Sequence, residues 1–224
     1  MANILLSPQW FFGYDIIFEL AFAIISLLVC FISYKIYKLT EENSLKLFGI
    51  SFLFISISYF IQSFFNFAIY SELSKNVVSL LSLSDINFFN LLGVYTNIIF
   101  FSLGLITLVY MTLKIKSPKT YSLLVIIPIF LLFMGCNKLY LYYALTSILL
   151  IYIAIYYFSN YINKRNLKSL LVFIAFDFLL FGQIHFIFSI NHVLYYILGH
   201  FLELIAYLLI LINLILIHKN GKKA

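Results

Sequence analysis

The residues of this 224-residue chain best suited to chemistry are a few acids, histidines and amides inside long apolar segments. A charged side chain in a lipid bilayer costs several kcal/mol, so such residues are rare there and usually functional. Carboxylates and imidazoles can exchange protons or bind ligands, and amides can orient a ligand through hydrogen bonds. The candidates for ligand binding or proton titration are Glu19, Gln62, Asn97, Asp177, His185, His200 and Glu203.

The last apolar segment carries the clearest functional face. Successive residues of an α-helix turn by about 100°, so residues three or four apart share one side. His200, Glu203 and Tyr207 fall on one side of this segment, whereas the opposite side consists of leucine and isoleucine. Similar polar stripes contain Glu19, Gln62, Asn97 and His185. We therefore expect a polar pocket between helices that opens toward the outside.

A metal ion is one alternative occupant of this pocket. His200 and Glu203 stand at i and i+3, and His185 with Glu19 could complete a set of nitrogen and oxygen ligands. A metal with an open position could activate water to hydrolyse a lipid-like substrate. Membrane hydrolases of the alkaline ceramidase type have seven helices and a zinc site, but the paired histidines expected on their last helix are missing here. We favour a protein that is not an enzyme.

Three non-enzymatic alternatives stay open. The polar groups could simply hold the bundle together through hydrogen bonds between helices. They could instead form the pocket of a sensor or receptor-like protein, with Glu203 and His200 accepting a ligand or protons and Glu19 as the gate. They could also serve a small-solute or proton-coupled transporter. Such a protein needs polar groups toward the cytoplasm, and the sequence offers few there, among them Asp177 and Asn213. The sensor is our first prediction.

The elements that position these residues are predicted to be transmembrane helices. Hydrophobic residues make up 64% of the chain and charged residues 10%, far from the balance of a soluble domain. About 20 apolar residues suffice for a helix to cross a bilayer. We predict one all-α polytopic membrane domain over residues 1–224, with seven transmembrane helices and an outer interfacial segment at 71–87. The helices are expected at 11–37, 45–70, 88–113, 120–135, 139–161, 167–189 and 193–218.

The basic residues predict how this bundle is oriented. Twelve of the fourteen lie in or beside alternate connections and the C-terminal tail, and only Lys75 and Lys138 do not. The positive-inside rule places those connections in the cytoplasm, with the N-terminus outside and the C-terminus cytoplasmic. The first apolar run has no basic region before it and is expected to be retained as a helix of a multi-pass protein of the cell membrane. The net charge of +6 thus reflects topology, and we expect a lipid bilayer rather than nucleic acid as the partner.

Gly199 to Lys219, with the sequence GHFLELIAYLLILINLILIHK, carries the pattern G-H-x-x-E-x-x-x-Y. This stretch resembles the last helix of small prokaryotic, archaeal-type seven-transmembrane proteins, some of which are related to the membrane sensor domains of signalling kinases. The resemblance implies a sensory or accessory role. Because the chain ends a few residues after this helix, we expect a separate signalling partner or a homo-oligomer to carry the output.

Two other seven-helix classes can be compared directly. The topology matches that of microbial rhodopsins, but their retinal needs a Schiff-base lysine in the last helix. No lysine stands between Val193 and Ile217, so the chain is not a retinal protein of the usual kind. The layout also resembles the 3+1+3 arrangement of SWEET and PQ-loop sugar transporters, with the fourth helix as linker, but no Pro-Gln pair lies within the first or fifth helix.

Overall fold

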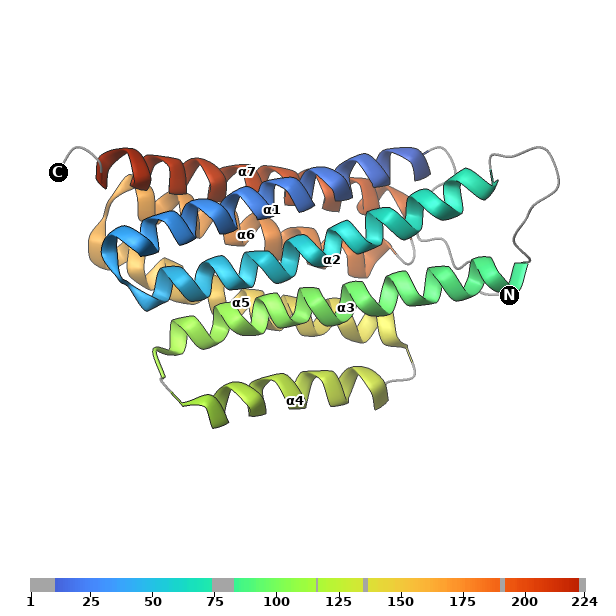
Figure 1. Cartoon of the computed structure of the whole chain (residues 1–224), viewed down its shortest axis with the longest axis horizontal. Helices are drawn as coiled ribbons and strands as arrows, with labels where there is room; N and C mark the ends of the chain where they lie inside the picture. The colour runs from blue at the N-terminus through green and yellow to red at the C-terminus, as the bar shows by residue number, and fades with distance from the viewer. Residues whose placement is uncertain (1–10, 74–82, 116, 135–136, 190–191, 222–224) are drawn as a thin grey trace.

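A computed structural model describes residues 11–73, 83–115, 117–134, 137–189 and 192–221. Over these residues the chain is all-α, with no strand (Figure 1). The helices are α1 (Phe12–Thr40), α2 (Asn43–Leu73), α3 (Leu83–Leu113), α4 (Pro118–Met134), α5 (Lys138–Lys164), α6 (Leu167–Ser189) and α7 (Val193–Gly221).

Each predicted helix is present, and the largest difference at any helix end is at the start of α3. That helix begins at Leu83 instead of residue 88. No proline or glycine stands between Leu83 and Leu92, so nothing in the sequence stops the helix there. The predicted interfacial segment at 71–87 therefore contributes its first residues to α2 and its last ones to α3, while 74–82 lie outside the described residues.

Six of the helices are long and apolar enough to cross a membrane, namely all except α4. Their apolar spans contain 23 to 29 residues, which at 1.5 Å per residue corresponds to about 34 Å or more. The chain is thus a helical, multi-pass membrane protein. The remaining helix, α4, has a shorter apolar stretch, Pro118–Phe130.

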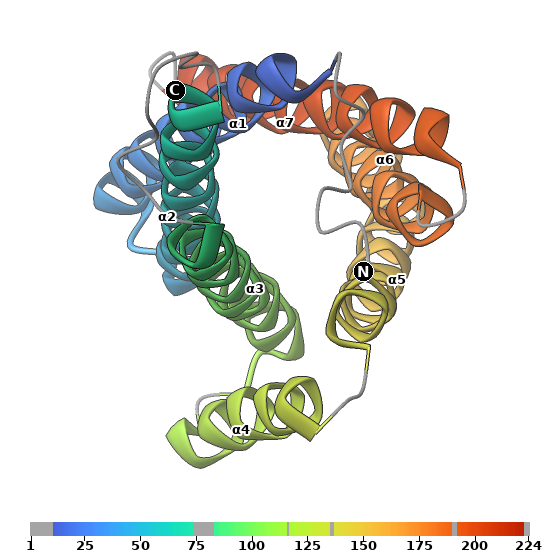
Figure 2. The ribbon, with the colours of Figure 1, turned by 90° about the vertical axis from the view of Figure 1, so that its right-hand side faces the viewer.

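The six long helices follow one another around a ring, which Figure 2 shows nearly end-on. Going round it, α1 packs on α2, then α3, α5, α6 and α7 follow, and α7 returns to α1. Within the described residues α4 packs only on α3 and α5 and lies outside this ring. The Tyr121 hydroxyl of α4 is 3.0 Å from Thr107 Oγ1, and its ring lies 5.1 Å from that of Tyr110.

The two ends of the bundle differ in charge. The α1–α2, α3–α4 and α5–α6 connections and the end of α7 lie at the same end (Figure 1), which we call the basic end. Its described basic residues are Lys35, Lys38, Lys46, Lys114, Lys119, Lys164, Arg165, Lys168 and Lys219. At the opposite end Lys138 donates a hydrogen bond to the Tyr95 hydroxyl and lies over the Tyr95 ring.

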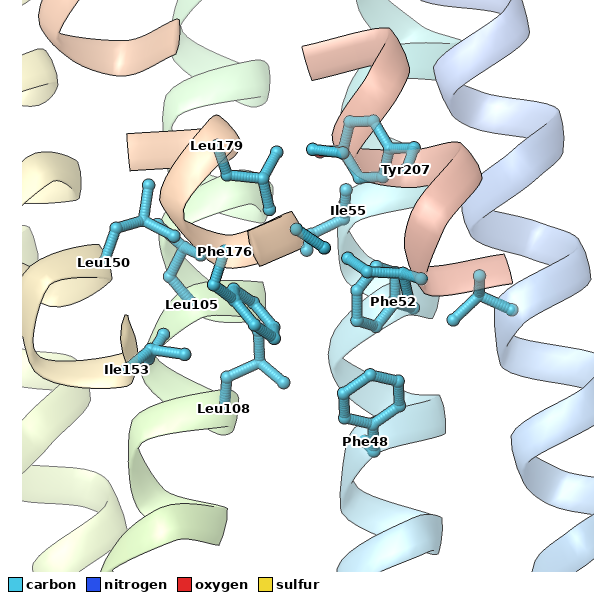
Figure 3. Close-up of a cluster of buried hydrophobic side chains, with 14 of the residues drawn as sticks. Phe48, Phe52, Ile55, Leu105, Leu108, Leu150, Ile153, Phe176, Leu179 and Tyr207 are labelled. Atoms are coloured by element: carbon cyan, nitrogen blue, oxygen red, sulfur yellow. The ribbon is translucent and has the colours of Figure 1, made fainter. Parts of the chain in front are cut away.

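An apolar core fills the middle of the ring (Figure 3). Its fully buried side chains come from all six ring helices and include Phe22, Phe52, Leu105, Leu150, Phe176 and Tyr207. The contact between α2 and α3 depends on Gly104. A Cβ atom there would lie 2.6 Å from Ile55 Cγ1 and 2.9 Å from the Ser51 carbonyl oxygen, so only glycine permits this approach.

Candidate functional site

A pocket of about 80 Å³ lies inside the ring and is lined by residues from all six ring helices. We call it the interhelical pocket. Its polar lining consists of Glu19 of α1, Tyr59 and Gln62 of α2, Asn97 of α3, Tyr142 and Tyr143 of α5, Gln183 of α6, and Tyr196, His200 and Glu203 of α7. This volume is enough for a few water molecules or one small solute.

Glu203 accepts hydrogen bonds from two other helices in the pocket, and it is only 1% exposed. Its Oε2 atom accepts a 3.0 Å hydrogen bond from the Tyr59 hydroxyl, and its Oε1 atom accepts a 2.7 Å bond from Gln183 Nε2. Gln183 Oε1 in turn accepts a 2.9 Å bond from Thr146 Oγ1. One chain of hydrogen bonds thus joins α5, α6, α7 and α2, and within the described residues no lysine or arginine pairs with Glu203.

Two glycines allow α6 and α7 to approach closely enough for this contact. A Cβ atom at Gly182 would lie 3.1 Å from Glu203 Cγ and 3.3 Å from the Gly199 carbonyl oxygen. A Cβ atom at Gly199 would lie 2.7 Å from the Phe186 ring. Small residues at helix interfaces let membrane helices approach closely, and here they bring the α6 amide to the α7 carboxylate.

Glu19, on the neighbouring helix α1, is held in place by α2. The Asn66 amide nitrogen lies 2.8 and 2.9 Å from the two carboxylate oxygens of Glu19. The Ser56 hydroxyl also donates to the Ala23 carbonyl oxygen at 2.8 Å, which fixes α1 against α2. These contacts orient Glu19, which is 1% exposed, toward the interior of the ring.

Asn97 links three helices on the α3 side of the pocket. Its Nδ2 atom donates a 2.8 Å hydrogen bond to Ser58 Oγ of α2. Its Oδ1 atom lies 3.5 Å from the Tyr142 hydroxyl of α5, at the outer limit for a hydrogen bond. The Asn97 amide therefore helps to close the ring between α3 and α5.

His200 is surrounded by aromatic rings and is 5% exposed. Its Nε2 atom lies 4.0 Å from Asp15 Oδ1, and neither ring nitrogen hydrogen-bonds to a described residue. The nearest ring, that of Tyr196, has its centroid 4.6 Å away. The other rings within 6.1 Å belong to Phe11, Phe18, Phe22 and Phe186. His200 thus packs as one aromatic ring among several in the wall of the pocket, with the Asp15 carboxylate at the limit of ion-pair distance.

The structure brings five of the seven predicted site residues to one pocket, and His185 and Asp177 are not among them. His185 Nδ1 lies 2.7 Å from the Phe181 carbonyl oxygen one turn earlier, and its ring packs near Tyr195. Asp177 is only partly buried. Gln183 is two residues before His185, which places it about 200° away around the helix. Because Gln183 faces the pocket, His185 faces away from it.

The predicted metal ligands are not assembled. Among the described residues, no group of three or more histidine, cysteine, aspartate or glutamate side chains is placed to hold a metal ion. His185 lies outside the pocket, while amide groups bind the carboxylates of Glu19 and Glu203. The arrangement consequently gives no support to a metal-dependent hydrolase.

Several residues of the site were not among the predicted ones. Gln183 is the only amide between residues 167 and 189, and that fact could have identified it. Tyr142 had no such signal, because the chain contains 18 tyrosines and most have an ordinary place in a membrane helix. Asp15 joins the site through its approach to His200 and through the 3.5 Å contact of its Oδ2 atom with the Tyr196 hydroxyl.

The interhelical pocket offers two carboxylates, an imidazole, three amides and several phenols. Such groups can accept protons, bind a small cation through oxygen atoms, or hydrogen-bond a small polar solute. The pocket is too small for a lipid or an oligosaccharide. No protein-family model, curated protein or solved structure matches this chain.

Proposed function

We propose that this chain is a non-enzymatic sensor or receptor-like protein of the cell membrane, with seven transmembrane helices and an outward-facing pocket. Its basic end would face the cytoplasm according to the positive-inside rule, which puts the N-terminus outside. The α4 helix counts as a span because α3 ends at the basic end and α5 begins at the opposite end. Its 17 residues reach about 25 Å, close to the thickness of the hydrocarbon core.

The observation that carries this proposal is the hydrogen-bond chain through Glu203. A proton or a small cationic solute that binds Glu203 competes with the Tyr59 and Gln183 donors. These donors belong to α2 and α6, so binding at one carboxylate alters contacts between three helices. A ligand shifts an equilibrium between two arrangements only if it binds one of them better, and competition with the Tyr59 and Gln183 donors would supply such a difference.

The output of the sensor would pass to a signalling partner or through a homo-oligomer. The stretch from Gly199 to Lys219 resembles the last helix of sensor-type membrane proteins, and this resemblance supports a signalling role. His200 and Glu203 both lie in that stretch and both line the pocket. The helix with the sensor-like pattern is therefore also the helix that contributes the central acid.

The test is a comparison of pocket variants in lipid nanodiscs. Hydrogen exchange of α2 and α7 would be measured between about pH 5 and pH 8, with and without a panel of small organic cations. We expect the wild type to respond, and Glu203→Gln and His200→Ala to lose most of the response. Asp177→Asn is the matched control, because Asp177 is a membrane acid outside the pocket. A response that survives in both pocket variants would contradict the proposal.

A small-solute or proton-coupled transporter is the second candidate. It is favoured by another cavity, of about 390 Å³, at the basic end of the bundle. Buried side chains such as Phe52, Leu105 and Tyr207, drawn in Figure 3, stand on α2, α3 and α7 between the residues that line the two cavities, so transport would require this apolar layer to open. Uptake of labelled solute or protons into proteoliposomes, lost in Glu203→Gln, would favour the transporter over the sensor.

A further inference from the structure

The cavity at the basic end differs in chemistry from the interhelical pocket. We call it the basic-end cavity; its volume is about 390 Å³ and residues of α2, α3, α5, α6 and α7 line it. Its floor is apolar and includes Phe48, Val172 and Leu214. Its polar wall includes Ser44, Lys114, Tyr156, Asn160, Lys164 and Asn213.

Asn213 supplies the first sign that this cavity holds a ligand. The residue is 4% exposed and lines the cavity, and its Oδ1 atom has no hydrogen-bond partner among the described residues. A buried polar atom without a partner costs about 1 to 3 kcal/mol, so an occupant with a hydrogen-bond donor would recover this energy. Asn213 is ten residues from Glu203, about 15 Å along α7, so the two sites are separate.

The charge of the wall indicates which kind of ligand fits. Lys114 follows the last turn of α3 in a left-handed conformation with φ of 55°, and Lys164 is the last residue of α5. Glu42 also lines the cavity, but among the described residues no carboxylate lies within salt-bridge distance of either lysine. The first turn of α2, including Ser44, also lines the cavity, but α3 and α5 contribute their C-terminal ends, so the helix dipoles do not decide the sign of the ligand. Two ammonium groups without a carboxylate partner favour an anion.

We propose that the basic-end cavity binds a phosphate group. Lys114 and Lys164 bind its oxygen atoms, and a hydroxyl group on the phosphate or on its substituent donates to the Asn213 amide oxygen. The cavity has room for a phosphate with a small polar substituent such as glycerol. The source is free phosphate or the headgroup of an anionic phospholipid in the adjacent leaflet. The site stands apart from the proposed function, since none of its residues lines the interhelical pocket.

The experiment uses the full chain in two arms. In the first, inorganic phosphate is titrated against the protein in phosphatidylcholine nanodiscs, and the rise in melting temperature gives the affinity. In the second, native mass spectrometry measures how much phosphatidylglycerol the detergent-solubilised protein retains. Binding in the first arm identifies free phosphate, and binding in the second arm alone identifies a lipid headgroup. Either result supports the inference if it depends on the two lysines.

The decisive variant carries both Lys114→Gln and Lys164→Gln. Its matched control is the double variant Lys119→Gln, Lys168→Gln. Both pairs remove two positive charges from the basic end, but Lys119 and Lys168 do not line the cavity. We expect the first pair to weaken binding by about tenfold or more, as the loss of charged hydrogen bonds requires, and the control pair to bind as the wild type does. Equal loss in both pairs, or no binding to the wild type in either arm, would overturn the inference.

A second variant separates binding from folding. Asn213→Leu removes a buried amide oxygen that has no partner among the described residues, so the ligand-free protein should melt no lower than the wild type. The same variant should bind phosphate or phosphatidylglycerol several-fold more weakly, because the donor on the ligand loses its acceptor. Unchanged binding by a folded Asn213→Leu protein would contradict the assignment of Asn213 to the site.

Discussion

The Tyr59 hydroxyl donates a 3.0 Å hydrogen bond to the Glu203 carboxylate, although the two residues are 144 positions apart in the sequence. The Gln183 amide donates to the other carboxylate oxygen at 2.7 Å. Helix α2 thereby meets the consecutive helices α6 and α7 at one acid in the interior of the ring. Removing that acid should therefore affect stability as well as function.

Glu203→Leu should lower the free energy of unfolding by about 2 to 3 kcal/mol, because the Tyr59 hydroxyl and the Gln183 amide both lose their buried acceptor. Glu203→Gln should cost less than about 1 kcal/mol, since its amide oxygen still accepts one bond. Unfolding in detergent would measure both. Asp177→Leu is the control and should not destabilise the protein, as Asp177 makes no contact in the pocket. A Glu203→Leu protein as stable as the wild type would contradict this prediction.

His200→Phe should stabilise the protein while removing the pocket response. The two ring nitrogens of His200 lack hydrogen bonds to the described residues, and phenylalanine fits among the surrounding aromatic rings. We expect a gain of about 1 kcal/mol, or roughly 2 to 4 °C in melting temperature. Tyr196→Phe, which removes only the long contact to Asp15, should change the melting temperature little. A clear loss of stability in His200→Phe would show that bound water or a ligand satisfies the imidazole.

Gly104→Ala should destabilise the protein by about 1 to 3 kcal/mol, because the added methyl group overlaps Ile55 and the Ser51 backbone and forces α2 away from α3. Gly13→Ala is the matched control. The atoms nearest to a Cβ atom there are 4.0 Å away, so this change should be neutral or stabilising through helix propensity. Thermal unfolding of both variants checks the prediction, which fails if they behave alike.

Orientation can be tested with single cysteines after replacing Cys30 and Cys136 by serine. His192 and Lys119 are exposed and lie at opposite ends of the bundle. A membrane-impermeant maleimide should label His192→Cys in intact cells and Lys119→Cys only after permeabilisation. The reverse pattern would place the basic end outside.

Tyr121→Ala should loosen α4 without affecting the ring. Tyr121 contributes the hydrogen bond to Thr107 and the ring contact to Tyr110, and α4 packs on only two helices of the described chain. Faster hydrogen exchange is expected in α4 alone. Tyr121→Phe keeps the ring contact and should have a smaller effect. Faster exchange throughout the bundle in Tyr121→Ala would mean that α4 supports the ring.

The sequence predicts a site residue only where it shows which face of the helix points into the ring. On α7, His200 and Glu203 share a polar face opposite leucine and isoleucine, and both line the pocket as expected. On α6, His185 and Gln183 are both polar and lie on different sides of the helix, so the sequence does not show which of the two faces the pocket. The structure turns Gln183 inward, where it meets Glu203.

By itself, the sequence determined the helices, their approximate ends and the concentration of basic residues at one end of the bundle. Hydropathy and charge act over short stretches of chain, so a single segment reveals them. Only the tertiary structure decided that Asp15 approaches His200, that Tyr59 meets Glu203 and that α4 lies outside the ring. In a bilayer the lipid and the protein core are equally apolar, so apolar residues do not distinguish the buried face of a helix from the lipid-facing one. Which helices meet is therefore decided by close packing at glycines and by hydrogen bonds between distant residues.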